Sequence, residues 1–132
     1  MAEVIEFATA PVVARGDGIE SVRLTDPPLP GQSFVMGITT FPPGTGLAFH
    51  SHNTVEQVTL VEGSGRVDID LDGESHRLRP HDTTHIAADR PHRFVNDGAG
   101  PMRILWVYGR TDVTRTFTET GETVAQLAPR PG

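Results

Sequence analysis

Hydrophobic and polar residues alternate along several short stretches of this chain. The clearest is 65–73, where three aliphatic residues alternate with three aspartates and the run ends in an Asp-Gly pair. A period of two predicts a half-buried strand, and the Asp-Gly pair predicts a turn after it. Further strands are predicted at 3–8, 20–25, 33–41, 47–52, 55–62, 74–79, 83–87, 92–96 and 102–110. No segment shows a convincing helical period.

The spacing of these strands favours an all-β fold. The chain has 132 residues, and its 14 glycines and 11 prolines indicate many turns. Short strands separated by Gly, Pro and Asp turns are typical of an antiparallel sandwich or barrel. We expect one domain over 1–132, since this length suffices for one core. The sequence is polar from Thr111 onward, so 111–132 is predicted to be a C-terminal surface arm, partly disordered.

Charge and composition exclude several function classes. The formal net charge of −6 argues against nucleic acid, whose phosphates require a basic face, and weakly against anionic membrane surfaces. No apolar run approaches the ~20 residues that span a bilayer, and the N-terminus lacks a basic leader region. The expected location is therefore the cytoplasm. All 11 basic residues are arginine and cysteine is absent, which excludes lysine Schiff bases and thiolate chemistry.

The segment 44–63 carries the residues best suited to bind a metal. His50 and His52 are two apart in a predicted strand, so their side chains point the same way. Glu56 begins the next predicted strand and can face the same interior. Two imidazoles and a carboxylate that converge from strands suit a divalent transition metal. Because the chain lacks cysteine, any metal must be held by nitrogen and oxygen.

The same segment resembles the first sequence motif of the cupin superfamily. That motif is a glycine, five residues, H-x-H, three or four residues, a glutamate, six residues and a glycine. Here it reads Gly44, His50, His52, Glu56 and Gly63. The five positions and their strand context make this a specific resemblance, which covers roughly 33–110.

The stretch "PHRFVN" at 91–96 is similar to the second cupin motif. It implies His92 as a fourth metal ligand and Asn96 as the asparagine of the motif. His81 stands where the family usually carries a glycine, and Ala87 and Asp89 replace a Pro-x-Gly. These positions shape turns and do not bind metal.

The resemblance implies an antiparallel double-stranded β-helix, or jelly-roll barrel, with its core at about 33–110. It also implies a metal site of three histidines and one glutamate: His50, His52, His92 and Glu56. Glu56 would also move a proton in catalysis. Iron, manganese, nickel, zinc and copper all suit these ligands. Small cupins include dioxygenases, decarboxylases, lyases and isomerases of small polar metabolites. The alternative is a non-catalytic cupin that binds a metal, a sugar or another effector.

Other polar and aromatic residues near the motifs receive structural interpretations. Arg93 follows His92, so alternation turns it away from the metal, and Arg103 is expected at the surface or an interface. We expect Phe94 to wall a pocket and Trp106 to fill the core. Asn96 is expected to fix a turn through backbone hydrogen bonds. The aspartates of 65–73 are expected on a solvated face, and His85 is a candidate for a subunit contact.

Three predicted strands are apolar on both faces. On 47–52 we expect Ala48 inward with the two histidines, and Leu47 and Phe49 outward. The outer faces of 55–62 and 102–110 also carry aliphatic residues. A sheet that meets water on one side alternates apolar and polar residues, so these outer faces should be covered. We therefore predict a homodimer that buries Phe49 and Val61.

Overall fold

The computed structural model describes residues 2–127, and within that range it contains twelve strands and no helix. The all-β prediction is therefore confirmed. The strands are β1 (Val12–Gly16), β2 (Ile19–Arg23), β3 (Val35–Phe41), β4 (His50–His52), β5 (Glu56–Glu62), β6 (Gly65–Ile69), β7 (Glu74–Leu78), β8 (Thr83–Ile86), β9 (His92–Val95), β10 (Met102–Tyr108), β11 (Thr114–Phe117) and β12 (Thr123–Ala125).

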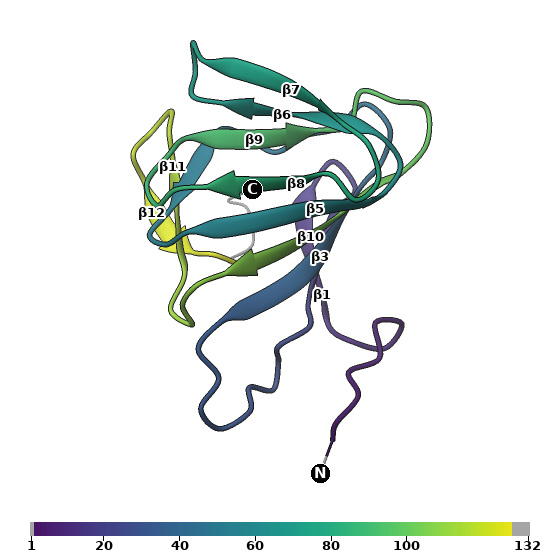
Figure 1. The fold of residues 1–132 in the computed structure, drawn as a ribbon, viewed down its shortest axis with the longest axis vertical. Coiled ribbons are helices and arrows are strands. Elements are labelled where there is room, and N and C mark those ends of the chain that lie inside the picture. Colours follow the sequence, from purple (N-terminus) through teal and green to yellow (C-terminus); the bar gives the residue numbers. More distant parts are fainter. Residues whose placement is uncertain (1, 128–132) are drawn as a thin grey trace.

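The strands form two antiparallel sheets that enclose one interior (Figure 1). One sheet has the order β1-β2-β3-β10-β5-β8, and the other has the order β12-β11-β4-β9-β6-β7. From β4 onward the chain crosses repeatedly from one sheet to the other, which produces the double-stranded β-helix of a jelly roll. The predicted jelly-roll architecture is confirmed.

Alternation along each strand places the core between the sheets. In β10 the residues Met102, Ile104, Trp106 and Tyr108 are buried, and the residues between them are half-buried on the outer face. β3 follows the same rule with Val35 and alternate residues inward. Burial of each large apolar side chain contributes about 1.5–3 kcal/mol. The core lies between the sheets beside the predicted metal site, since β5 and β9 contribute to both.

Some predicted strands have different bounds. Residues 3–8 form no strand, and the first strand begins at Val12. The strand predicted at 65–73 ends at Ile69, because Asp70 has a φ of 60° and starts a turn. Leu71 is consequently exposed. Asp68 is buried, so the expected solvated position is wrong for this aspartate. Arg93 Nε and Ser75 Oγ both donate hydrogen bonds to its carboxylate.

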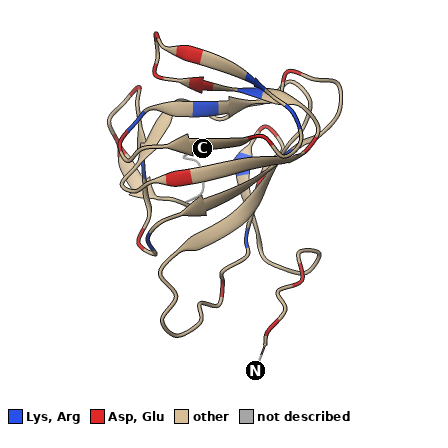
Figure 2. Cartoon of the chain, in the orientation of Figure 1, with Lys and Arg blue, Asp and Glu red and all other residues tan. Residues whose placement is uncertain are grey.

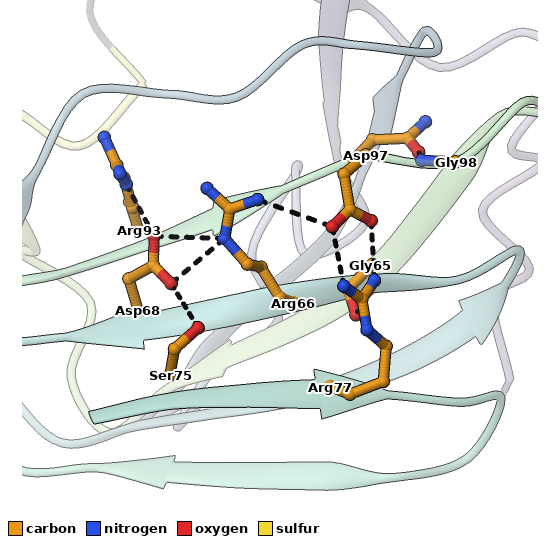
Figure 3. A network of polar contacts seen from close by, with 9 residues as sticks. Gly65, Arg66, Asp68, Ser75, Arg77, Arg93, Asp97 and Gly98 are labelled. Atoms are coloured by element: carbon orange, nitrogen blue, oxygen red, sulfur yellow. Dashed lines mark hydrogen bonds and ion pairs between the residues drawn. The ribbon is translucent and has the colours of Figure 1, made fainter.

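This aspartate belongs to a polar network on the outer face of β6, β7 and β9 (Figure 3). Arg66 lies between Asp68 and Asp97, at 3.1 Å from the first carboxylate and 3.4 Å from the second. Arg77 also binds Asp97, because its Nη1 donates a hydrogen bond to Oδ1 and its Nη2 donates one to Oδ2. The three strands are thereby tied together on the side that faces away from the core.

The prediction of a polar surface arm from Thr111 is wrong for the described part of that segment. β11 pairs with β4, and β12 pairs with β11, so both strands extend the second sheet. Val113, Arg115 and Gln126 are buried. A polar sequence concealed this role because the buried side chains of the segment are themselves mostly polar. Residues 128–132 of the predicted arm lie outside the described residues.

The approach to β4 also differs from the prediction. Regular strand geometry begins only at His50, so simple alternation does not extend back to Leu47. Leu47 packs against the core, and Ala48 is exposed. Phe49 lies beneath the Arg93 guanidinium, whose central carbon is 4.5 Å from the ring centroid.

The two residues chosen for the dimer interface lie on different sheets. Phe49 leads into β4, whereas Val61 lies in β5 of the opposite sheet. The homodimer that buries both residues stays a prediction. Acidic and basic residues are interspersed over the described strands (Figure 2). Within 2–127 we find no helix of the length and hydrophobicity that crossing a membrane requires.

Candidate metal centre

Three histidines from two adjacent strands meet inside the barrel. His50 and His52 lie on β4, and His92 begins β9, where it pairs directly with His50. One nitrogen from each ring can be chosen so that all three lie within 4.8 Å of one another. All three side chains are buried. The structure thus brings together the three predicted histidines, including the one inferred from the second motif. We call these residues the metal wall.

Backbone carbonyls fix the orientation of each imidazole ring. The Nδ1 atoms of His50, His52 and His92 lie 2.7, 2.9 and 2.9 Å from the carbonyl oxygens of Ala48, Thr114 and Arg90, respectively. A carbonyl only accepts, so each Nδ1 carries the proton and each neutral ring keeps its Nε2 lone pair. Metal-binding histidines are commonly oriented in this way.

Glu56, at the start of β5, brings a carboxylate to the same point. Its Oε1 lies 2.9 Å from His92 Nε2 and 3.8 Å from His52 Nε2. Among the described residues, neither Glu56 Oε1 nor His92 Nε2 has a hydrogen-bond partner, and both atoms are buried. At 2.9 Å, the contact between Glu56 Oε1 and His92 Nε2 is stabilised either by a second proton on His92 or by a metal ion that both atoms bind. This donor set of three nitrogens and one oxygen fits a divalent transition metal.

The pKa shifts at the centre favour neutral imidazoles on His50 and His52 and an ionised carboxylate on Glu56. Burial, reinforced by His92 and His52, lowers the pKa of His50 to about 3. Burial also lowers the pKa of His52, against the opposing charge of Glu56. Burial raises the pKa of Glu56, but contact with His92 and the charges of the histidines outweigh it and bring that pKa to about 2.

His92 differs from the other two histidines. Burial lowers its pKa, but the adjacent Glu56 carboxylate outweighs burial and raises it. Near neutral pH, Glu56 is therefore anionic and His50 and His52 are neutral, as metal coordination requires. A proton on His92 or a metal ion can each neutralise the facing carboxylate.

The turns around the centre keep the motif geometry with partly different residues. Gly44 and Gly63 of the first motif have φ angles of 77° and 84°, which favour glycine. His81 and Asp89 adopt φ angles of 80° and 65°. These two residues stand at positions where the family usually carries glycine, so the backbone conformation is retained without it. Sequence alone left the loop geometry at these positions open.

Asn96 fixes the end of β9 as predicted. Its Nδ2 donates to the carbonyl oxygens of Phe41 and Gly100, both at 2.9 Å, and its Oδ1 accepts from Gly98 N at 3.0 Å. The side chain is completely buried. Its role is therefore to join β3 to the turn before β10.

A cavity of about 30 Å³ adjoins the metal wall. It is also lined by two buried arginines, Arg15 on β1 and Arg115 on β11, and by Gln126. Arg115 pairs with His52 across the sheet and donates to the Gln126 carbonyl oxygen. We call Arg15, Arg115 and Gln126 the arginine wall. Sequence reasoning missed all three, because no motif marks them.

Arg15 lies at a β-bulge. The pairing register of β1 with β2 shifts between Ala14 and Gly16, so Arg15 is the extra residue. Burial alternates from Val12 to Arg15, so the strand period itself turns Arg15 toward the interior, on the same face as Val13. Bulges commonly lie beside functional sites.

Polar side chains continue around the cavity. Ser21 Oγ and Thr39 Oγ1 lie 2.8 Å apart, and Trp106 Nε1 donates to Thr39 Oγ1 at 2.8 Å. Trp106 therefore belongs to the core, as predicted, and also lines the cavity, as does Phe94. These side chains connect the two walls along the floor of the cavity.

Tyr108 links the two walls directly. Its hydroxyl lies 3.3 Å from His52 Nε2 and 3.4 Å from Gln126 Nε2. Burial and the negative charge of Glu56 raise the pKa of Tyr108 well above its usual value, so the phenol stays protonated. The cavity therefore holds a buried proton donor within reach of the metal wall.

The remaining candidates lie outside the cavity. Arg93 turns outward to Asp68, and Arg103 lies near Glu62 and Phe7 on the outer face. His85 is exposed on β8 and pairs with Gln57 across the sheet. The predicted outward orientation of both arginines is confirmed, and a subunit contact through His85 stays a prediction.

Comparison with known proteins decides the family. The model of the cupin domain family matches residues 37–108, more than half of the chain. The chain belongs to the cupin family. This cupin is 31% identical over 127 residues to the protein SchB of Streptomyces halstedii, covering 92% of this chain and 91% of SchB.

Two further proteins extend the comparison. Polyketide synthase CurC of Streptomyces cyaneus is 33% identical over 92 residues, which make up 70% of this cupin and 58% of CurC. The structure of the polyketide cyclase RemF of Streptomyces resistomycificus superposes with a TM-score of 0.74 at 20% identity, covering 92% of this cupin and 89% of RemF. At that identity RemF supports the fold alone.

Proposed function

We propose that this cupin is a metal-dependent enzyme in which His50, His52, His92 and Glu56 hold a divalent transition metal. The observation that carries the proposal is the orientation of the three imidazoles. Each Nδ1–H is held by a backbone carbonyl, which directs the Nε2 lone pairs toward a buried carboxylate. Burial of this donor set without a cation would cost several kcal/mol. A resident metal removes that cost.

We further propose proton-transfer chemistry beside a carbonyl group, as in an isomerase, lyase or cyclase. A bound metal would polarise the carbonyl oxygen of a small substrate. Glu56 is the one carboxylate among the described residues that line the cavity, so we assign it the role of accepting a proton from the adjacent carbon. Tyr108 stays protonated and can donate a hydrogen bond to developing negative charge on oxygen.

The comparisons support this reaction class over oxygenation. CurC is named a polyketide synthase, and polyketide chains carry reactive ketone groups. The small cavity also suits a small reacting group. Dioxygenase chemistry on the same ligands is the competing outcome.

Metal content tests the first part of the proposal. Inductively coupled plasma mass spectrometry should find close to one equivalent of a transition metal in the untagged protein. His92→Ala should remove most of it, whereas His76→Ala should not, because His76 is exposed on β7 and contacts Glu74. A wild-type protein that takes up no transition metal would overturn the metal-dependent enzyme.

Isotope exchange tests the reaction class. The metal-loaded protein is incubated in D₂O with pyruvate or acetylacetone, and deuterium in the carbon–hydrogen bonds beside the carbonyl is followed by NMR. Exchange above the rate of the His92→Ala variant, with and without air, supports proton transfer. Oxygen uptake with substrate cleavage, and no exchange under nitrogen, would assign an oxygenase instead.

A further inference from the structure

The cavity beside the metal wall is closed and small. The three histidines of that wall and Glu56 are all buried. The cavity volume of about 30 Å³ corresponds to roughly two waters, at about 10–15 Å³ each by the same measure. A substrate of even a few carbon atoms does not fit this space. Part of the lining must therefore move before a substrate can reach the metal wall.

Most of the lining belongs to strands with a neighbour on both sides. β2, β3, β4, β5, β9, β10 and β11 each pair with two strands, so displacing any of them breaks two ladders of hydrogen bonds. The other lining residues are Arg15, Leu47 and Gln126. Arg15 lies inside the five-residue strand β1, and Leu47 lies between the bridge at Gly46 and β4. Gln126, which follows β12, is the remaining candidate for movement.

Residues 123–127, which we call the C-terminal strap, are weakly attached to the barrel. Their strand, β12, has three residues, lies at the edge of its sheet and pairs with β11 alone (Figure 1). Beyond β12, the Gln126 N–H donates to the Val113 carbonyl oxygen at 3.1 Å, and the Gln126 carbonyl oxygen accepts from Arg115. Short, exposed pairing at a sheet edge is typical of segments that open locally.

The side chain of Gln126 leaves the closed arrangement incomplete. Its Oε1 is buried and has no hydrogen-bond partner among residues 2–127. Its Nε2 lies 3.4 Å from the Tyr108 hydroxyl, which is long for a hydrogen bond. A buried acceptor without a donor destabilises the closed state, and water supplies the donor once the side chain is exposed. The missing hydrogen bond therefore lowers the cost of opening at the residue of the strap that lines the cavity.

The strap is held most closely at the end farthest from Gln126. The Phe117 N–H donates to the Glu122 carbonyl oxygen at 2.9 Å in the turn before β12. The hydroxyl oxygens of Thr116 and Thr123 lie 2.8 Å apart beside that turn. The turn can therefore stay in place while the rest of the strap moves.

We propose that the C-terminal strap is a lid over the cavity, which separates from β11 to admit a metal ion and a small substrate and then closes over them. The inference rests on the proposed function only for what enters, and the opening can be measured without a metal. Once closed, the lid keeps bulk water away from Tyr108 and the metal wall during proton transfer.

A disulfide lock tests the proposal, because the chain has no cysteine of its own. Thr114 and Ala125 are paired across β11 and β12. Thr114 alternates with the buried Arg115, and Ala125 is exposed, so a bridge between these positions lies on the outer face. The oxidised double variant Thr114→Cys/Ala125→Cys ties the strap to β11 one residue before Gln126, and reduction with a phosphine releases it.

A second lock provides the matched control. Thr59 and Thr83 are paired across β5 and β8, and their hydroxyl oxygens lie 2.8 Å apart on the exposed face. Oxidised Thr59→Cys/Thr83→Cys joins two antiparallel strands in the same way but leaves the strap free. Mass spectrometry verifies each bridge, and circular dichroism verifies that each variant is folded.

Trp106 reports opening in the metal-free protein. It is the only tryptophan of the chain, is 2% exposed and lines the cavity. Acrylamide, a small neutral molecule, should quench its fluorescence when the lid opens. The oxidised strap lock should lower the quenching constant about threefold or more against its reduced form, because it suppresses local opening. The control lock should leave the constant unchanged.

Zinc uptake measures passage to the metal wall itself. Metal-free protein is mixed with Zn²⁺ and a chromophoric zinc indicator in a stopped-flow instrument. The oxidised strap lock should slow uptake at least about tenfold against the oxidised control lock, with the same final zinc content.

A loosened lid should give the opposite result and decides the case if the lock distorts the fold. Leu127 packs against the core, so Leu127→Ala weakens the attachment of the strap and should increase both the quenching of Trp106 and the rate of zinc uptake. Leu105→Ala is the control, because Leu105 is a half-buried leucine on the outer face of β10. It should change neither measurement.

The outcomes separate the lid from the proposed function. If the protein takes up no zinc but the strap lock lowers the quenching of Trp106, the proposed function fails and the lid stands. Quenching that the strap lock leaves unchanged, or lowers no more than the control lock does, would overturn the lid. Measurable zinc uptake at the same rate in both locks would overturn it as the route to the metal wall.

Discussion

The two walls of the cavity are built on different principles. The metal wall comes from β4 and β9, inside the segment that the cupin family model matches, and its ring orientations are fixed by backbone carbonyls. The arginine wall comes from β1, β11 and the residue after β12, all outside that segment. The difference teaches that the cavity is assembled from two separate parts of the chain: the metal wall from the segment that the family model covers, and the arginine wall from strands that flank it.

The largest effect is expected when one histidine of the metal wall is removed and the arginine wall is left unchanged. His50→Ala and His52→Ala each delete a ligand, so we expect metal affinity to fall more than about 100-fold, beyond the loss typical of outer-shell changes. The hydrophobic core residues are unchanged in both variants, so the far-ultraviolet circular dichroism spectrum should stay that of the wild type. Mass spectrometry of bound metal checks the result, and full occupancy in either variant would refute the ligand assignment.

A second change separates the charge of Glu56 from the shape of its side chain. Glu56→Gln keeps the size of the side chain but removes the carboxylate charge. We expect deuterium exchange into pyruvate to fall about 100-fold or more, the low end of general-base contributions, with a smaller loss of metal. Parallel rate and metal measurements decide the question. Equal activity in the variant would exclude a role for the charge of Glu56.

A third change tests the floor between the walls. Thr39→Val leaves Trp106 Nε1 and Ser21 Oγ without their shared partner in the interior, so unfolding free energy should fall by about 1–3 kcal/mol. Thr59→Val is the matched control, because Thr59 bonds Thr83 through the same kind of hydroxyl contact on the exposed face. Chemical denaturation measures both. Equal losses in the two variants would show that the buried position carries no special cost.

The smallest effect is expected at Asp68, on the outer face of the sheet that carries the metal wall. Partial burial raises the pKa of Asp68, but hydrogen bonds from Arg93, Ser75 and Arg66 outweigh it and lower that pKa. A lowered folded-state pKa stabilises the fold above the unfolded value of ~3.9, and this stability is lost as pH falls through the folded value. Asp68→Asn should therefore cost about 1 kcal/mol near neutral pH.

The pH dependence provides the check on that prediction. The stability difference between the wild type and Asp68→Asn should shrink as the pH falls below about 4, as urea denaturation at several pH values would reveal. A difference that stays constant with pH would mean that the carboxylate charge is not responsible. Metal content should stay close to that of the wild type, because Arg93 turns away from the cavity.

Local regularities in the sequence predicted short antiparallel strands and the side-by-side placement of His50 and His52, whereas the jelly-roll architecture and His92 were predicted from the resemblance to the cupin motifs. Alternation marked β5 and β10 correctly, and H-x-H places two side chains on one face wherever the strand is regular. Alternation failed before His50, where regular strand geometry ends and Leu47 turns inward. It failed again in 65–73, where the turn at Asp70 ends the strand early.

The arginine wall escaped prediction for a physical reason. Whether Arg115 is buried depends on the pairing of β11 with β4 across a long separation in the chain, and the sequence near Arg115 does not encode that pairing. Arg15 lies in the short β1–β2 hairpin, where alternation turns it inward but nothing in the sequence marks the inner face. Arg115 faces the cavity because it lies opposite His52, 63 positions earlier in the chain. A polar segment such as 111–127 reads as solvent-exposed until the partners of its polar groups are known.

The bulge at Arg15 also bears on how this protein can change over evolutionary time. Deleting one residue from the β1–β2 hairpin would restore the ordinary register and turn a different side chain toward the interior. Such a deletion touches neither motif and leaves every metal ligand in place. The lining of the cavity can therefore change through small length changes at the edge of a sheet while the three histidines of the metal wall are inherited intact. A laboratory search for new activities in this scaffold would best begin with hairpin-length libraries at that edge.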